Sequence, residues 1–441
     1  MSLPLLDYDR AADRDRLEAL IRRLRDSTAA DSDVADTVAA VIDDVRHNGD
    51  DALVKYMRQW TDPNFTADMI RVDESQLDAA DRNLPPDIRD ALARAIDHVQ
   101  TYQQHIMPTD PPPIEIDGAR LGLRFTPIPR VGLAVPGGTA AYPSSVYMLA
   151  VPAQVAGVEQ LSIVSPPPTA RSGQPTGDVS PLVLGVCAML GLTEIYRIGG
   201  AQAVAALALG TASVKPVDFI AGPGNAYVQQ AKRQLLGAVG IDGFFGPSEV
   251  VILADASANP DRVAADLLAQ AEHDPGCCFL IATDQNVIDN ILTALTARLP
   301  HCQRRPAIEQ ALAQWSAAIR VPDDRAAAQL VDALAAEHVT LAVADPQTTL
   351  DTLRHGGAWF LGDSTPVASG DYYAGPSHCL PTGTSARYTS GCSVYTFLKR
   401  SSVEQYPHGM PDQVIDDIAR LAQAEGLDAH AHSARVRKPR T

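Results

Sequence analysis

Residues 160–236 alternate short runs rich in β-branched side chains with longer runs rich in alanine and leucine. The successive runs are QLSIV (160–164), PLVLGVCAML (181–190), EIYRI (194–198), AQAVAALALG (201–210), DFIA (218–221) and NAYVQQAKRQLL (225–236). The first run of each pair is typical of a buried strand, and the second is typical of a helix. This alternation predicts a parallel sheet covered by helices.

The same alternation resumes after residue 249 and predicts a second α/β unit. Its strand candidates are VVILA (250–254), CCFLIAT (277–283), HVTLAV (338–343) and AWFL (358–361). Outside the two units, helical patterns cover residues 13–25, 35–47, 75–107 and 412–424. We therefore expect an α/β protein with helical segments at both ends.

The composition indicates a soluble globular protein and argues against binding to nucleic acid or insertion into a membrane. The chain has 441 residues, of which 46% are hydrophobic and 20% charged, and it carries a formal net charge of −17. Its longest basic segment is the short RVRKPR near the C-terminus, so binding to nucleic acid through phosphate contacts is not expected. Membrane-spanning and signal-peptide patterns are not recognised, and the six cysteines have no CxxC spacing. These observations favour the cytoplasm.

A long polar loop follows the apolar run AWFL. Residues 369–391 read SGDYYAGPSHCLPTGTSARYTSG and have neither the period of a strand nor that of a helix. Such loops at strand ends are usually functional or disordered. The concentration of Asp371, His378, two tyrosines and several hydroxyl groups favours a functional loop.

Three glycine-containing turns are found where strands are expected to end. They are VPGGTAAYPSS (135–145), GGAQA (199–203) and GPGNA (222–226). Glycine permits a tight turn, and the free amides of a following helix can face an anionic ligand such as a pyrophosphate. None of the turns is a GxGxxG or P-loop motif, so each alone is equally consistent with a simple connection. Together they favour a nucleotide or another anionic ligand.

Two groups of residues that contain histidine could bind a metal ion. Gln270 and His273 lie three residues apart at the end of a helical pattern, so they share a face. A histidine at a helix C-terminus is also favoured by the helix dipole alone. His430 and His432, in the tail, are either ligands or solvated side chains. Without a cysteine site, a metal would need nitrogen and oxygen ligands, which suit zinc with an open position for substrate.

Glu337 and His338 lie where a helical pattern meets the strand HVTLAV. A carboxylic acid next to an imidazole offers two proton-transfer groups with different pKa values. The alternative is a capping glutamate beside a half-buried histidine, and the local sequence alone favours that alternative.

Eight segments, taken in order, resemble the histidinol dehydrogenase family. They are VPGGTAAYPSSVYMLAVPAQVAGV, GGAQAVAALALGT, GPGNAYVQQAK, GPSEVVILAD, ADLLAQAEHDPG, AEH (336–338), FLGDSTPVASGDYYAGPSHCLPTG and EGLDAHAHS. The resemblance extends from about residue 30 to the tail. It implies a zinc-dependent homodimer that oxidises L-histidinol through L-histidinaldehyde to L-histidine with two NAD⁺, the last steps of histidine biosynthesis.

Carried over position by position, the resemblance implies a set of site residues. The zinc ligands would be Gln270, His273, Asp371 and His430, and the acid/base pair would be Glu337 and His338. The substrate would contact the ligands, His338, Ser248, His378 and Glu425, whereas NAD would contact Gln202 and Asn225. Glu425 and His430 belong to a tail that would enter the partner subunit's site.

The strand pattern and the resemblance together imply two Rossmann-like parallel-sheet domains with helical extensions, in a dimer whose C-terminal tail reaches the partner. The expected division is an N-terminal helical arm (1–30), a discontinuous first domain (31–130 plus 249–390), a second domain (131–248) and a C-terminal helical tail (391–441).

The chain departs from the family pattern at a few positions. Ala134 stands where many members have a nucleotide-contacting tyrosine, and Phe245 stands beside Ser248 where a small residue is usual. Cys379 and the TGTSARYTSG segment differ modestly from the common LPTGGTAR pattern.

Two alternative functions remain beside histidinol oxidation. A paralogous zinc- and NAD-dependent dehydrogenase would oxidise another polar alcohol to its acid; Phe245 is compatible with it, whereas Glu425 suits a cationic substrate and disfavours an anionic one. A non-catalytic zinc-binding protein would have no reason to retain Glu337 and His338.

Overall fold

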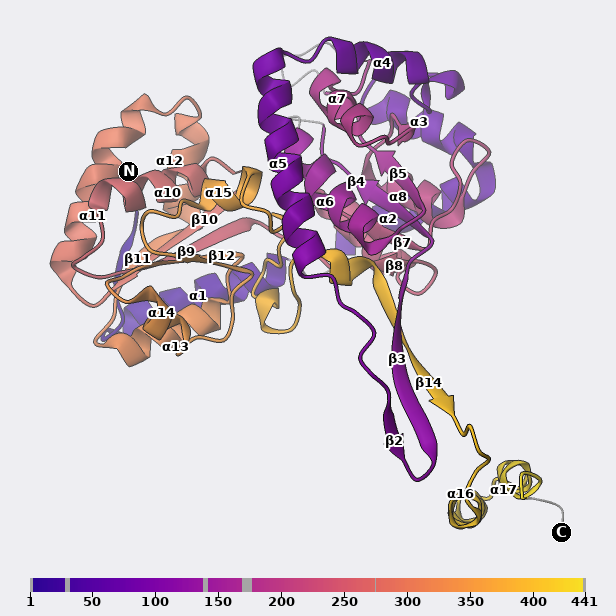
Figure 1. Cartoon of the computed structure of the whole chain (residues 1–441). Helices are drawn as coiled ribbons and strands as arrows, with labels where there is room; N and C mark the ends of the chain where they lie inside the picture. Colours follow the sequence, from indigo (N-terminus) through magenta and orange to yellow (C-terminus); the bar gives the residue numbers. More distant parts are fainter. Residues whose placement is uncertain (1–2, 28–31, 138–141, 169–176, 274, 439–441) are drawn as a thin grey trace.

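The computed structural model describes residues 3–27, 32–137, 142–168, 177–273 and 275–438. Figure 1 shows two α/β domains beside each other and a narrow arm that projects away from them. Each domain contains a parallel sheet, which confirms the predicted α/β class with two parallel-sheet domains. Within these residues, helices of sufficient length and hydrophobicity to cross a membrane are absent.

The first sheet has five parallel strands in the order β6-β5-β4-β7-β8. Its elements, in chain order, are β4 (Arg130–Ala134), α6 (Pro143–Ala156), β5 (Gln160–Val164), α7 (Pro181–Met189), β6 (Glu194–Tyr196), α8 (Gly200–Leu209), β7 (Phe219–Ala221), α9 (Ala226–Leu235) and β8 (Gly240–Ile241). The earliest strand, β4, lies at the centre, and the later strands are added first on one side and then on the other. This is the doubly wound order, in which a crevice opens at the carboxyl ends of the central strands.

Helices from the N-terminal third cover this five-stranded sheet. They are α2 (Ser32–Asn48), α3 (Asp50–Trp60), α4 (Glu74–Arg82) and α5 (Pro86–His105). Buried residues of α2 and α3 share a hydrophobic cluster with α8 and α9, whereas α4 and α5 share one with α6 and α7. The expected division grouped residues 31–130 with 249–390, but these helices pack on the sheet of residues 130–241 instead.

The second sheet has six parallel strands in the order β1-β11-β10-β9-β12-β13. Its strands are β1 (Leu5–Asp7), β9 (Ser248–Ala254), β10 (Gly276–Ala282), β11 (Ala317–Arg320), β12 (His338–Ala342) and β13 (Ala358–Leu361). Its helices are α1 (Ala11–Ser27), α10 (Pro260–Ala271), α11 (Gln285–Arg298), α12 (Arg305–Gln314), α13 (Asp324–Leu334), α14 (Pro346–Leu350) and α15 (Val367–Tyr372).

Side chains of the six-stranded sheet alternate between two hydrophobic clusters. Val250 and Ile252 of β9 pack with α10 to α12, whereas Val251 and Leu253 face α1 and α13. This is the period of two expected for a strand buried on both faces. Because β1 is an edge strand of this sheet and α1 packs on it, residues 3–27 are an integral part of this domain rather than a separate arm.

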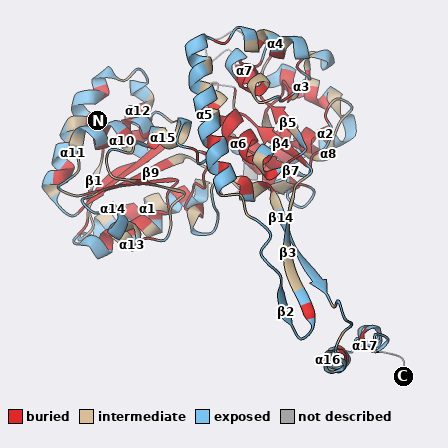
Figure 2. Cartoon of the chain, in the orientation of Figure 1, coloured by how far each residue is buried: buried red, intermediate tan, exposed pale blue. Residues whose placement is uncertain are grey.

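The projecting arm is a three-stranded antiparallel ribbon that carries two helices at its end (Figure 1). The ribbon contains β2 (Ile114–Ile116), β3 (Ala119–Pro127) and β14 (Leu398–Gln405), and the helices are α16 (Asp412–Ala424) and α17 (Asp428–Arg435). Most residues of β2 and β14 are exposed, as Figure 2 shows. The predicted C-terminal helical segment at 412–424 is therefore confirmed, and it lies far from both sheets.

Candidate active site

A cavity of about 600 Å³ lies between the two sheets. From the five-stranded sheet it is lined by residues at the carboxyl ends of β4, β5 and β7, including Val135, Val164 and Pro223. From the six-stranded sheet it is lined by Ser248 and His338, which begin β9 and β12. The cavity therefore uses the switch-point crevice of one sheet and the opposite, amino-terminal edge of the other.

Glycines allow the backbone to approach closely on the five-stranded side of the cavity. A Cβ atom on Gly137 would lie 2.3 Å from the carbonyl oxygen of Pro166, and one on Gly199 would lie 2.6 Å from the ring of the same proline. Both glycines line the cavity, so side chains here would displace its wall. Residues 138–141 of the first glycine turn lie outside the described residues.

Glu337 and His338 are held side by side by polar groups at the start of β9. Oε2 of Glu337 accepts hydrogen bonds from the Ser248 hydroxyl at 2.5 Å and from the Glu249 amide at 3.1 Å. Nδ1 of His338 donates to the Glu249 carbonyl at 3.0 Å, and Nε2 lies 3.7 Å from Oδ1 of Asp371. Because Nδ1 is the donor, Nε2 is the free base of the neutral ring.

Burial shifts the pKa values of both groups, each towards its uncharged form. It raises the pKa of Glu337 to about 7, although hydrogen bonds from Ser248 and Glu249 act in the opposite direction. It lowers the pKa of His338, which the neighbouring Asp371 partly offsets. A buried acid and base whose pKa values are moved in this way are typical of a catalytic site.

Two of the predicted zinc ligands, His273 and Asp371, line the cavity, and the third, Gln270, bonds to Ser248 in its wall. Gln270 is buried in the last turn of α10, His273 follows that helix, and Asp371 lies in α15. Burial, with smaller contributions from His338 and His378, lowers the pKa of His273 to about 4, so this ring is neutral and able to bind a metal. Burial also raises the pKa of Asp371 to about 6 against the attraction of His338.

The amide of Gln270 offers the clearest indication that an ion fits here. Its Nε2 donates to the Ser248 hydroxyl at 2.6 Å, and that hydroxyl donates to Glu337, which sets the orientation of the amide. Within the described residues, Oε1 of Gln270 is buried and has no hydrogen-bond partner. A buried acceptor without a donor is rare in folded proteins, and a cation would satisfy it.

His430 and Glu425 are not brought to the cavity within the same chain. Both lie in the helical pair at the end of the arm, where they are exposed (Figure 1). Accordingly, no group of three or more His, Cys, Asp or Glu side chains within the described part of the chain could hold a metal ion.

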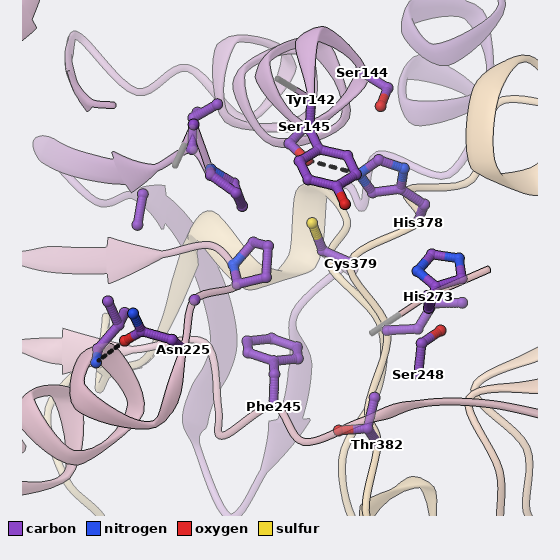
Figure 3. A pocket seen from close by; sticks show the side chains of 18 of the residues that line it. Tyr142, Ser144, Ser145, Asn225, Phe245, Ser248, His273, His378, Cys379 and Thr382 are labelled. Atoms are coloured by element: carbon purple, nitrogen blue, oxygen red, sulfur yellow. Dashed lines mark hydrogen bonds between the residues drawn. The ribbon is translucent and has the colours of Figure 1, made fainter. Parts of the chain in front are cut away.

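His378 lies in the cavity wall, as predicted for the functional loop (Figure 3). Its Nδ1 donates to the Asp371 carbonyl at 2.9 Å, and its Nε2 accepts from the Ser145 hydroxyl at 3.2 Å. Burial lowers the pKa of His378 to about 4. Ser145, in α6, therefore links the glycine-rich side of the cavity to the acid/base side.

The two predicted NAD contacts have different surroundings. Asn225 lines the cavity, but its Oδ1 caps α9 by accepting from the amides of Tyr227 and Val228, which leaves its Nδ2 for a ligand. Gln202 is buried in α8 beneath the cavity wall, where its Nε2 lies 3.8 Å from Sδ of Met57. Phe245, the departure noted beside Ser248, lies between Asn225 and Ser248 in the view of Figure 3.

Sequence patterns missed several polar residues that support the site. Glu249 is fully buried, and its carboxylate accepts from the Gly383 amide at 2.9 Å and from the Glu337 amide at 3.3 Å. Lys232 and Asp242 form a buried ion pair of 2.5 Å beneath the turn of residues 222–225. The signal for Glu249 was present, because a charged residue interrupts the otherwise apolar strand SEVVILA.

A cavity between two α/β domains, lined by the buried Glu337 and His338 with shifted pKa values, is typical of an enzyme. A family model described as histidinol dehydrogenase matches residues 24–438. The chain therefore belongs to the histidinol dehydrogenase family.

Individual relatives extend over almost the whole chain. Histidinol dehydrogenase of Rhodospirillum rubrum is 45% identical over 427 residues, which cover 96% of this chain and 95% of the relative. That of Caulobacter vibrioides is 46% identical, with 94% of each chain covered. The crystal structure of histidinol dehydrogenase from Elizabethkingia anophelis is similar with a TM-score of 0.90 and 30% identity, covering 99% of this chain and 98% of the other.

Proposed function

We propose that this protein oxidises L-histidinol through L-histidinaldehyde to L-histidine, with zinc and two NAD⁺, in the cytoplasm. The observation that carries the proposal is the arrangement of Gln270, with its unpartnered buried oxygen, next to Ser248 and the acid/base pair. Family membership supports the substrate, because the relatives are named histidinol dehydrogenase. The six free cysteines are consistent with a reducing compartment.

The residues present suit both cofactors. Gln270, His273 and Asp371 would hold zinc together with His430 of the partner subunit, and the glycine-lined crevice with Asn225 would hold NAD⁺. When bound, zinc acts as a Lewis acid that orients the amino alcohol, and NAD⁺ accepts hydride. His378, Ser248 and Glu425 of the partner subunit would orient the substrate.

Glu337 and His338 act as bases in different steps of the reaction. In the first oxidation, Nε2 of His338 takes the alcohol proton, because Nδ1 is already committed to the Glu249 carbonyl. In the second, the aldehyde must gain a water before it can lose another hydride. Glu337, whose pKa burial raises to about 7, is the base that takes a proton from that water.

The homodimer is supported by the composition of the arm. The helices α16 and α17 share a buried cluster of Ala419, Ala422 and Ala431, and the other buried residues that they contain are Ile415 and Ala434. In contrast, Leu421 is 68% exposed and Val436 is 60% exposed. A helical pair with so small a core and such exposed side chains needs another surface to cover it. A second copy of the chain would cover it and bring His430 and Glu425 to the cavity.

Phe245 favours the paralogous dehydrogenase as a second candidate. Its ring lines the cavity beside Ser248, so it could alter the substrate that fits there. In this case zinc and NAD⁺ would act on another polar alcohol.

One pair of assays separates the candidates. Zinc content is measured on the purified protein, and NADH formation is followed with L-histidinol and with other polar alcohols. Zinc together with turnover of L-histidinol supports the proposal. Turnover only of another alcohol would instead favour the paralogous enzyme, and zinc without any turnover would favour a non-catalytic protein.

A further inference from the structure

The turn of residues 222–225 is held from below by a buried pair of opposite charges. Lys232 of α9 is completely buried, and its ammonium group donates to the Gly222 carbonyl at 3.0 Å. Asp242, which follows β8, accepts from the Gly222 amide at 2.6 Å through its other oxygen while it pairs with Lys232. Both polar groups of Gly222 are therefore fixed by the same ion pair.

Gly222 occupies a position where the backbone has little freedom to relax. Its φ angle is +118°, and a Cβ atom there would lie 2.2 Å from the carbonyl oxygen of Ala134. The turn is thus pressed against the end of β4, at the centre of the sheet where the crevice opens. Such a conformation persists only when its surroundings hold it.

Further contacts extend the support along the turn and into the connection between the domains. The amide of Gln229, also in α9, donates to the Gly224 carbonyl at 3.2 Å and accepts from the Phe245 amide at 3.0 Å. The Phe245 ring lies 4.9 Å from the ammonium group of Lys232. One helix therefore holds both the turn and the segment of residues 242–247 that leads to Ser248.

We propose that Lys232 and Asp242 are positioning residues that preorganise the turn of residues 222–225 for the dinucleotide. The inference rests on the proposed use of NAD⁺ and goes beyond it, because neither residue lines the cavity. Burying an ion pair is costly unless its hydrogen bonds are well satisfied, and an apolar pair of similar volume is often equally stable. Here the charged pair provides what an apolar pair cannot, which is an acceptor for the amide and a donor for the carbonyl of the same residue, Gly222.

The test compares variants that separate charge balance from the contacts with Gly222. The double variant Lys232→Met/Asp242→Leu leaves no unpaired buried charge but removes both contacts. Asp242→Asn retains an acceptor for the Gly222 amide and keeps Lys232. As a matched control, Lys55→Met/Asp44→Asn removes an ion pair of 2.6 Å that links α2 to α3 in another part of the domain.

Calorimetry measures NAD⁺ binding by the zinc-loaded dimer, and urea unfolding measures stability. We expect the double variant to bind NAD⁺ at least about tenfold more weakly, since preorganisation is lost. Asp242→Asn leaves the buried Lys232 without a counter-charge, so it should lower the stability. In the folded state, Asp242→Asn and the surface control should still bind NAD⁺ within about threefold of the wild type, because both keep the contacts with Gly222. Wild-type affinity in a folded double variant would overturn the inference.

A measurement on the wild type keeps the inference testable if the double variant does not fold. Hydrogen exchange of the Gly222 amide should be as slow without NAD⁺ as that of the central strands, because Asp242 already holds it. Fast exchange that slows only on NAD⁺ binding would contradict preorganisation. If the wild type did not bind NAD⁺ at all, the proposed function would fail, which is a different result from unchanged binding in the variant.

Discussion

Single side chains near β9 determine which atoms can exchange protons. The Glu249 backbone bonds to both members of the acid/base pair, and the Ser248 hydroxyl connects Glu337 to the Gln270 amide. Nε2 of His338 and Oε1 of Gln270 take no part in these hydrogen bonds. Substitutions at these residues should therefore alter individual steps rather than the fold.

We expect His338→Asn to slow both oxidations and Glu337→Gln to slow mainly the oxidation of the aldehyde. General acid–base groups contribute about 10²- to 10⁴-fold to a rate, so the losses should fall in that range. The measurement compares steady-state rates with L-histidinol and with L-histidinaldehyde as the starting substrate. Equal losses of both half-reactions in the Glu337 variant would refute the division of roles.

Glu249 should make stability depend on pH in a defined direction. Burial raises its pKa from the ordinary 4.5 to about 8, so between these pH values the folded state keeps a proton that the unfolded state has released. Its contribution is therefore complete below about pH 4.5 and is lost as the pH rises towards 8. Relative to the wild type, Glu249→Gln should become more stable by up to about 1.4 kcal/mol per pH unit across this window.

Denaturant unfolding of both proteins at several pH values from 5 to 8 checks this slope. The Gln variant also loses part of the pairing to the Gly383 and Glu337 amides, which gives an offset that does not depend on pH. A stability difference that stays constant over the range would show that Glu249 is already ionised at low pH.

At the scale of elements, we expect the exposed surface of the arm to hold the dimer together. Leu421→Asp places a charge on an exposed apolar position of α16 and should give a monomer that loses zinc and activity together. Gln423→Asp adds the same charge to an exposed polar position of the same helix and serves as the control. Light scattering and zinc content are the readouts, and a monomer that retains zinc would exclude a shared site.

Periodicity predicted most elements but not the way they assemble. The segment 412–424 and the buried strand CCFLIAT were expected correctly, because both patterns depend only on neighbours in the chain. The sheet on which helices α2 to α5 pack was not predicted correctly. An amphipathic face shows that a helix is buried on one side, but it does not show which surface buries it. Likewise, the sequence places residues 337–338 at the start of a strand, but it does not reveal that this edge of the sheet faces the carboxyl ends of the other sheet, because that depends on the placement of the two domains.

The residues of the candidate site, too, could be predicted only in part from the sequence. The resemblance supplied Glu337, His338 and the ligand positions. In the structure, Glu337, His338, His273 and Asp371 line one cavity, and Gln270 bonds to Ser248 in its wall. Ser145, Lys232 and Asp242 could not be found from local patterns, since their partners lie elsewhere in the chain or are backbone groups. Their roles depend on contacts that only the folded chain defines.

At the scale of the whole molecule, two copies should share each site. Mixing subunits that carry His273→Ala with subunits that carry His430→Ala, each inactive alone, creates hybrid dimers with one complete site. Random exchange in equal amounts should restore about a quarter of the wild-type activity, because half of the dimers are hybrids and half of their sites are intact. No recovery after verified exchange would indicate that His430 acts within its own chain.

The amount of NADH formed per L-histidinol consumed tests the central claim most directly. It is measured at completion, with the zinc-loaded protein and NAD⁺ in excess. A ratio of two is expected, because one acid/base pair carries the alcohol through the aldehyde to the acid. A ratio of one, with aldehyde as the product, or the absence of NADH would contradict the account.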